Sequence, residues 1–216
     1  MSGLVVVFAK PPVPGRVKTR LAADVGDGVA ARLARAFLSD TVLGLRALRG
    51  WDVRLSTPNP DADHGVQVNA WQQGGGDLGA RMERAFRRGF DEGYDRVLAM
   101  GADSPGAPSE RWIGAARSLD SHASVIGPAS DGGFDLLGLR ACPAGLFQGL
   151  PWSHPTTGAR VEDRLRTMGQ APHVLPPWFD VDHLKDLKRL RMEVPRQRLP
   201  QTWPILVEVL GAPGSD

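Results

Sequence analysis

The chain has 216 residues, enough for one medium-sized domain that buries most of its apolar surface. Its 26 Lys and Arg residues against 24 Asp and Glu residues leave a net charge of +2, which is too balanced for a general nucleic-acid-binding protein. The single cysteine excludes an internal disulfide and a cysteine-based zinc cage, and no run approaches the roughly 18 apolar residues of a membrane span.

Strands and helices alternate along the sequence. The continuous apolar run over residues 4–9 predicts a strand buried on both faces. Apolar side chains at three-to-four-residue spacing predict a long amphipathic helix over residues 27–48. Further strands are expected over residues 51–56, 66–71, 96–100, 124–127 and 134–139, and further helices over residues 78–92, 109–119, 158–168 and 183–193. This order predicts an α/β fold: a three-layer α/β/α sandwich around a mostly parallel, Rossmann-like sheet.

No repeat or low-complexity linker divides the chain, so we expect a single domain over residues 1–216, with residues 195–216 as a C-terminal appendage. The first residues lack the basic region, long apolar core and cleavage site of a signal peptide, and we therefore expect a cytoplasmic protein. We expect Cys142 to pack as a small apolar side chain.

The segment FAKPPVPGRVKTRLA, residues 8–22, is the most informative part of the sequence. Ligands of open α/β sheets bind beyond the carboxyl ends of the strands, so a basic loop directly after the first strand suits a polyphosphate. Its prolines restrict the backbone, and Gly15 permits close approach of the main chain to a ligand. An ordinary solvated loop is the alternative. The loop carries four cations: Lys10, Arg16, Lys18 and Arg20.

Two acidic motifs follow later apolar runs. Asp103, in GADSP, stands where metal-binding carboxylates of such sheets gather, and a hard cation such as Mg²⁺ takes one or two carboxylates together with phosphate oxygens. A helix cap is an equally weighted role for Asp103. In WFDVD, alternation directs Asp180 and Asp182 to one face. One of them would complete the metal site while the other caps the helix near residue 183, although two caps are the alternative.

Two glycine-containing motifs suit close contact with a ligand. In GPASDGGFDLLGL, Asp131 precedes Gly132 and Gly133, which would let the backbone pass close to a sugar ring; an Asp-Gly hairpin turn is compatible with that role. In GGGDLGARM, we expect Asp77 to cap a helix whose first amides, near Gly79, face an anion or a base edge. A flexible loop is the alternative there.

One tryptophan could contact a ligand. Trp152, in PWSHPTT, could stack on a base or a sugar, whereas a packed tryptophan under a loop is the commoner arrangement. The sequence has no G-x-S-x-G elbow, no Walker pattern and no zinc-type histidine spacing, which disfavours a serine hydrolase, a P-loop NTPase and a zinc enzyme.

Five motifs in register resemble the DUF2064 family, whose members are assigned to the nucleotide-diphospho-sugar transferase (GT-A) fold. They are FAKPPVPGRVKTRLA, GDLGARM, GADSP, GPASDGGFDLLGL and FDVDHLKDL, and the resemblance covers nearly all of residues 3–190. Some members of this family are described as glycosyltransferases linked to arsenosugar biosynthesis. The chain also looks like a distant relative of molybdenum cofactor guanylyltransferase and 2-phospholactate guanylyltransferase.

The resemblance implies a role for each motif. It implies Mg²⁺ or Mn²⁺ held by Asp103, with Asp182 chosen over Asp180 as the second ligand, and catalytic roles for Asp103 and Lys18. The residues implied to bind the nucleotide are Lys10, Gly15, Arg16, Lys18, Arg20, Asp77 and Gly79, and those expected to bind the substrate are Asp131, Gly132, Gly133 and Trp152.

The chain departs from the family pattern in three places. Ala102 stands where Ser or Thr is usual, Phe134-Asp135 replaces an aromatic pair, and SHPTTGAR replaces a more regular WST segment. The last two departures fall where an acceptor would bind, so they bear on the acceptor more than on the nucleotide.

The leading expectation is a metal-dependent glycosyltransferase that takes a nucleotide-sugar and a small-molecule acceptor. The family description favours this activity. Nucleotidyl transfer from a nucleoside triphosphate is the close alternative, because four cations suit a triphosphate. A non-catalytic nucleotide-binding protein on the same fold is the alternative of another class.

Overall fold

The computed structural model describes residues 2–211 and arranges their seven strands in one sheet, in the order β3-β2-β1-β4-β6-β5-β7. Among these strands only β6 runs antiparallel to its neighbours, so the expectation of a mostly parallel sheet is confirmed. The strands are β1 (Gly3–Phe8), β2 (Trp51–Thr57), β3 (Asn69–Gln72), β4 (Arg96–Gly101), β5 (Ser124–Pro128), β6 (Phe134–Leu139) and β7 (His173–Val174).

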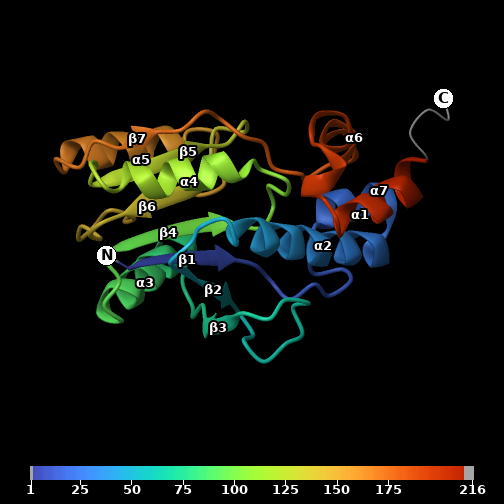
Figure 1. Ribbon diagram of the computed structural model, residues 1–216, viewed down its shortest axis with the longest axis horizontal. Coiled ribbons are helices and arrows are strands. Elements are labelled where there is room, and N and C mark those ends of the chain that lie inside the picture. The colour runs from blue at the N-terminus through green and yellow to red at the C-terminus, as the bar shows by residue number, and fades with distance from the viewer. Residues whose placement is uncertain (1, 212–216) are drawn as a thin grey trace.

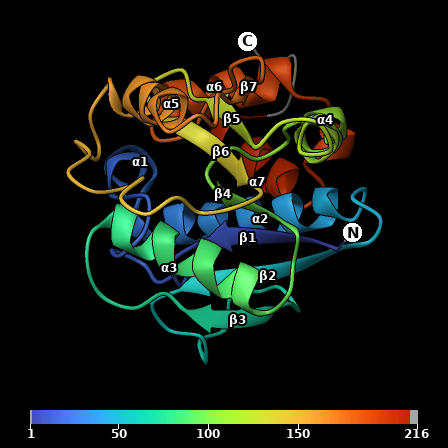
Figure 2. The same ribbon diagram turned by 90° about the vertical axis from the view of Figure 1, so that its left-hand side faces the viewer.

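Helices cover both faces of the sheet, which confirms the three-layer arrangement (Figure 1, Figure 2). Alternate side chains of β1 point to opposite faces. Val5 and Val7 pack toward α2 (Asp27–Leu45) and α4 (Ser109–Ser118). Their neighbours in the strand, Leu4 and Val6, pack toward α3 (Leu78–Asp91) and α5 (Thr157–Thr167). Within residues 2–211, no helix has the length and apolar character needed to cross a membrane.

A third apolar cluster lies beyond the end of the sheet toward which β1 and β4 point, where Figure 1 shows α1, α6 and α7 gathered beside α2. Leu21, Phe37, Leu187 and Leu206 are buried there. These helices are α1 (Thr19–Val25), α6 (Leu184–Glu193) and α7 (Thr202–Leu210), with a 3₁₀ turn (Arg196–Arg198) before α7.

The segment expected as an appendage contributes to this third cluster. Leu199 and Leu206 are fully buried, and α7 packs against α2 and α6. Residues 212–216, the rest of that segment, lie outside the described residues. The C-terminal residues up to 210 are therefore part of the packed body.

The structure adds four elements that the sequence patterns did not predict: α1, β7, the 3₁₀ turn and α7. Helix α7 reads TWPILVEVL, which is apolar nearly all round and therefore carries no stripe at helical spacing. Strand β7 has only two residues, too few for an alternating pattern. Cys142 is half-buried against the α3–α5 side of the core, as expected, and burial raises the pKa of its thiol to about 11.

Candidate active site

The candidate residues gather at the carboxyl edge of β1 and β4. These strands are parallel neighbours whose last paired residues are Phe8 and Gly101, so the chain leaves both strands at the same level. The basic loop (residues 9–18) follows β1, and the GADSP turn follows β4. A third segment reaches the same place, because the backbone N–H of Val181 donates to the carbonyl of Asp103 at 2.9 Å.

Lys18 lies at the centre of this site. Its Nζ is 2.6 Å from Oδ1 of Asp103 and 3.1 Å from Oδ1 of Asp182, and it donates to the carbonyl of Val181 at 2.9 Å. Only 5% of the Lys18 side chain is exposed, whereas 58% of Asp103 and 42% of Asp182 are exposed. The ammonium therefore lies beneath two carboxylates that face solvent.

The backbone of Lys18 is left-handed, with φ at 48° and ψ at 42°. This conformation costs a non-glycine residue about 1–2 kcal/mol, and such strain tends to persist where the surroundings fix a functional group. Lys18 is also the residue directly before α1, so the basic loop ends there and Arg20 lies on the helix rather than in the loop.

The two carboxylates set the protonation of Lys18. Burial alone lowers the pKa of the ammonium, but the negative charges of Asp103 and Asp182 outweigh it and raise the pKa above its ordinary value. Lys18 is therefore fully charged at neutral pH.

The other three basic residues of the first motif are exposed to solvent. Arg20 lies 3.6 Å from Oδ2 of Asp182 through its Nη1, with 70% of its side chain exposed. Lys10 and Arg16 form no ion pair within residues 2–211. Between them, Gly15 has a φ of 74°, which any side chain would strain. Arg20 is thus open to an anionic ligand beside Asp182, and Lys10 and Arg16 are exposed on the loop that leads to Lys18.

Asp180 lies in the same site, but neither Asp180 nor Asp182 caps α6, so the expectation that one of this pair caps the helix is wrong. The carboxyl of Asp180 accepts a hydrogen bond from the hydroxyl of Ser104. Burial raises the pKa of Asp180 to about 6, and the negative charge of Asp103 adds to this shift. Instead, the side chain of Asp186 accepts from the backbone N–H groups of Asp182 and His183 at the start of α6.

Asp103 is likewise free of a capping role. Helix α4 begins at Ser109, and Pro108 stands at its cap position with no side-chain hydrogen bond. The carboxylate of Asp103 instead pairs with the ammonium of Lys18, and its role as a metal ligand stays a prediction.

The Asp131 loop forms the turn of a hairpin between the antiparallel strands β5 and β6. Oδ1 of Asp131 accepts from the N–H of Gly133 at 2.8 Å, within its own turn. A Cβ on Gly132 would lie 1.9 Å from the carbonyl oxygen of Pro155, so the close approach that this glycine permits is to the chain's own backbone.

Trp152 and Gly79 pack against each other. A Cβ on Gly79 would lie 2.7 Å from the indole, and the indole also contacts the rings of Phe134 and Phe147. This is the packed arrangement that the sequence left as the alternative. Asp77 caps α3 as expected, since its Oδ1 accepts from the N–H of Ala80 at 2.8 Å.

The glycine run before α3 is held by arginines of that helix. Arg81 donates to the carbonyl of Gly76 at 2.9 Å, and Arg84 donates to the carbonyls of Gln73 and Gly75. These contacts use carbonyl oxygens, so they leave the amides of the run available to an anion.

Sequence reasoning missed the buried pair of Arg111 and Asp135. Their side chains are 4% and 3% exposed and are joined by two hydrogen bonds. Asp135 was noted only as a departure from an aromatic pair. A charged residue in a strand that is otherwise buried is a sequence signal for a buried partner.

The residues present fit a hard divalent cation. Two carboxylates already converge on one cationic atom, Nζ of Lys18. Residues 2–211 contain no group of three or more His, Cys, Asp or Glu side chains placed to hold a metal ion. Asp103 and Asp182 could therefore supply part of a coordination shell that substrate phosphates and waters complete, as is typical of Mg²⁺.

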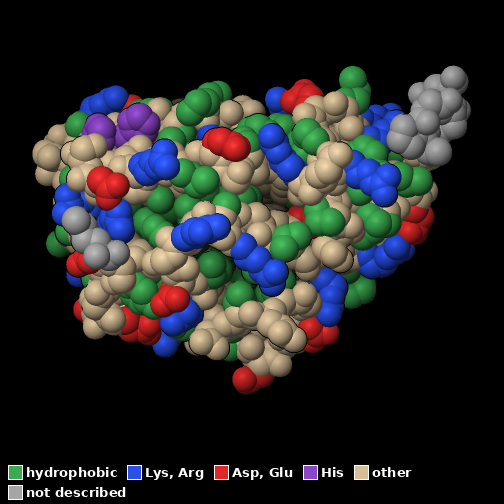
Figure 3. Space-filling model, viewed as in Figure 1, with side chains coloured by type: hydrophobic (Ala, Val, Ile, Leu, Met, Phe, Trp, Pro, Cys, Tyr) green, Lys and Arg blue, Asp and Glu red, His purple; other side chains and the backbone are tan. Residues whose placement is uncertain are grey.

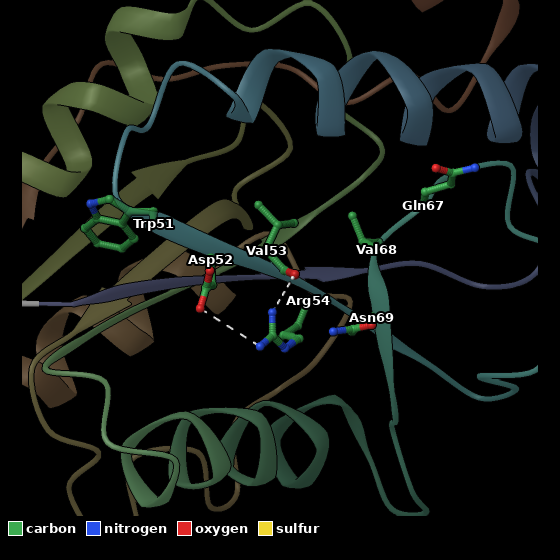
Figure 4. A pocket seen from close by; sticks show the side chains of 7 residues that line it. All are labelled: Trp51, Asp52, Val53, Arg54, Gln67, Val68 and Asn69. Atoms are coloured by element: carbon green, nitrogen blue, oxygen red, sulfur yellow. Dashed lines mark hydrogen bonds and ion pairs between the residues drawn. The ribbon is translucent and has the colours of Figure 1, made fainter.

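A shallow hollow lies elsewhere, at the amino-terminal ends of β2 and β3. It measures about 550 Å³, and Figure 4 shows Arg54 within it, 4.0 Å from Asp52. None of the candidate residues lines it, and it faces away from the edge at which parallel sheets bind their ligands. On the face drawn in Figure 3, Lys and Arg side chains are interspersed with acidic ones rather than gathered into one basic field.

Comparison with known proteins agrees with this architecture. The profile of a family described as "Uncharacterized protein conserved in bacteria (DUF2064)" matches residues 29–154. A crystal structure from Desulfovibrio desulfuricans G20, described as a "putative nucleotide-diphospho-sugar transferase", is 36% identical and superposes with a TM-score of 0.86 over 96% of this chain and 95% of that chain. No protein with a curated description matches.

More distant structures share the fold alone. CMP:2-keto-3-deoxy-manno-octonic acid synthetase, solved with CTP, is 14% identical with a TM-score of 0.55 over 89% of this chain and 98% of that chain. 2-C-methyl-D-erythritol 4-phosphate cytidylyltransferase from Thermus thermophilus is 12% identical with a TM-score of 0.52 over 95% of this chain and 99% of that chain. The fold is therefore the one found in nucleotide-diphospho-sugar transferases and nucleotidyltransferases.

Proposed function

This chain belongs to the DUF2064 family, and from that premise we propose that it is a metal-assisted transferase that acts at the diphosphate of a nucleotide-sugar. The observation that carries the proposal is the convergence of Asp103 and Asp182 on Nζ of Lys18, with Arg20 3.6 Å from Asp182, at the end of a basic loop that follows β1. The relative that is 36% identical over nearly the whole chain supports a nucleotide-sugar as the donor.

In this proposal, basic side chains bind the phosphates and carboxylates bind the metal ion. Lys10, Arg16 and Arg20 would bind the phosphates, since their side chains are exposed and come from the loop and helix start that follow β1. Asp103 and Asp182 would hold Mg²⁺ or Mn²⁺, which when bound neutralises charge that builds on the leaving phosphate. Asp77 caps the start of α3. The backbone amides of the glycine run before that helix would face the nucleotide.

In glycosyl transfer, an acceptor hydroxyl attacks the anomeric carbon. The bond from that carbon to the phosphate oxygen breaks, a nucleoside diphosphate leaves, and the acceptor proton passes to solvent or to a base. The cations of the first loop stabilise the diphosphate as it takes up negative charge.

Nucleotidyl transfer is the second candidate, and the three exposed cations favour it. In that reaction the acceptor attacks the α-phosphorus of a triphosphate and pyrophosphate leaves. A triphosphate carries more charge than a nucleotide-sugar, and Lys10, Arg16 and Arg20 could all contact it.

A thermal-shift screen with nucleotide-sugars and nucleoside triphosphates, each with and without Mg²⁺ or Mn²⁺, tests the proposal. A ligand at about 100 times its dissociation constant adds roughly 2.7 kcal/mol to stability, a readily measured shift. A metal-dependent shift with a nucleotide-sugar, followed by release of a nucleoside diphosphate on adding acceptor, is the expected result. Pyrophosphate release from a triphosphate would instead establish nucleotidyl transfer, and binding without turnover would favour a non-catalytic protein.

Two variants sharpen this test. Asp103→Asn should abolish turnover and the metal dependence of the shift while the chain stays folded, whereas the exposed Asp61→Asn should change neither turnover nor metal dependence. Arg16→Ala should weaken nucleotide binding by about 1–3 kcal/mol, the usual cost of losing a charge-assisted contact. Unchanged turnover in Asp103→Asn would refute the assignment of the metal site.

A further inference from the structure

We propose that Lys18 is the fixed counter-ion of the Asp103–Asp182 pair rather than a phosphate-binding residue. In this role it holds the two carboxylates together and disfavours binding of a divalent cation until a nucleotide arrives. The inference rests on the proposed function, because it assumes that these carboxylates receive a metal. The proposed role would replace the phosphate-binding role that the family resemblance implies for Lys18.

The hydrogen-bond donors of Lys18 are fully used inside the chain. An ammonium group has three N–H donors. Oδ1 of Asp103, Oδ1 of Asp182 and the carbonyl of Val181 accept them at 2.6, 3.1 and 2.9 Å. None remains for a phosphate oxygen in this arrangement. Lys10 and Arg16, by contrast, have no ion-pair partner among residues 2–211.

The position of Lys18 links three segments that are distant in sequence. It ends the loop after β1, Asp103 follows β4, and Asp182 precedes α6. The side chain is 5% exposed, and its Nζ lies 5.8 Å from the centre of the Phe37 ring. Withdrawal of the ammonium toward a phosphate would leave the two carboxylates with no cation between them, which like-charge repulsion disfavours.

The charge of Lys18 also sets how attractive the site is to a free cation. The two carboxylates and the ammonium carry a single net negative charge, and Arg20, 3.6 Å from Asp182, reduces the attraction further. A divalent cation arriving alone therefore meets a largely neutralised pair. The phosphates of a nucleotide add negative charge and oxygen ligands, so cation and nucleotide should bind together.

Mn²⁺ binding to the full chain without nucleotide, followed by the electron paramagnetic resonance signal of free Mn²⁺, tests this role. Lys18→Gln and Lys18→Met each remove the charge at similar length, and both should bind Mn²⁺ at least tenfold more tightly than the unmodified chain. Lys18→Arg keeps the charge and should stay as weak as the unmodified chain. Lys188→Met, which removes an exposed charge from α6, is the matched control and should shift affinity less than threefold.

A second substitution shows whether the additional Mn²⁺ binds at the Asp103–Asp182 pair. Asp103→Asn in the Lys18→Gln background should remove the additional Mn²⁺ affinity. The proposal is overturned if that affinity persists, if neither neutral variant binds more tightly, or if the unmodified chain already binds Mn²⁺ as tightly as they do. The Mn²⁺ affinities are measured without turnover. If the variants show the expected affinities but the chain transfers no group from any nucleotide, the proposed function is refuted and the role of Lys18 is retained.

Discussion

At the scale of single residues, Arg111 and Asp135 form a deeply buried ion pair. Nη2 and Nε of Arg111 donate to the two carboxylate oxygens at 2.6 and 3.1 Å, and Nη1 donates to the carbonyl of Pro176. Burial raises the pKa of Asp135, and the guanidinium opposes that rise. The pair joins α4, β6 and the segment leading to Asp180, so it supports one wall of the candidate site.

Removing one partner should leave the other charge buried and alone. Arg111→Met should therefore lower the free energy of unfolding by about 3–5 kcal/mol in urea denaturation. The exposed Arg117→Met, on the same helix, is the matched control and should change it by less than about 0.5 kcal/mol. The double variant Arg111→Met/Asp135→Leu should recover most of the loss, because two apolar side chains replace the pair. A loss below about 1 kcal/mol in the single variant would contradict this account.

At the scale of elements, helix α7 is capped from a distant helix. Asp40 of α2 is buried, and its two carboxylate oxygens accept from the backbone N–H groups of Gln201 and Thr202, each at 2.9 Å. These amides stand at the start of α7 and have no partner within the helix. A carboxylate there also interacts favourably with the positive end of the helix dipole.

Asp40→Ala should leave two amides of α7 unsatisfied and reduce stability by about 1–3 kcal/mol. Asp40→Asn keeps one acceptor oxygen and should lose less. Thermal unfolding followed by far-ultraviolet circular dichroism measures both variants. Equal stability of Asp40→Ala and the unmodified chain would mean that this contact does not hold α7 in place.

At the scale of the whole molecule, the third apolar cluster connects the chain's C-terminal helices to the candidate site. Lys18 lies directly before α1 and Asp182 close to the start of α6, and both helices pack in that cluster. The burial of Leu206 of α7 in the same cluster means that the end of the chain contributes to the support of the site.

Leu206→Ala should therefore destabilise the entire chain by about 2–5 kcal/mol. Met192→Ala, at a side chain 83% exposed on α6, is the matched control and should have little effect. We expect tryptophan fluorescence and circular dichroism to report one coincident transition in both variants. Two separate transitions, with only the later one sensitive to Leu206→Ala, would show that the C-terminal helices unfold as an independent unit.

The sequence alone was enough to predict the fold class and most elements, because apolar periodicity is a local property. The run over residues 4–9 and the stripe over residues 27–48 gave β1 and α2 within a few residues. The sequence also placed Lys18 and Asp103 in one region, because the carboxyl ends of parallel strands meet at one edge, whereas Asp182 was chosen over Asp180 with the help of the family resemblance.

Only the tertiary structure decided what these residues do to one another. Lys18 is buried under the carboxylates of Asp103 and Asp182, and Asp180 accepts a hydrogen bond from Ser104 instead of capping α6. Both arrangements join side chains that are more than 70 residues apart in the sequence. Burial and ion pairing are set by the packing of whole elements, and no local spacing in the sequence carries that information.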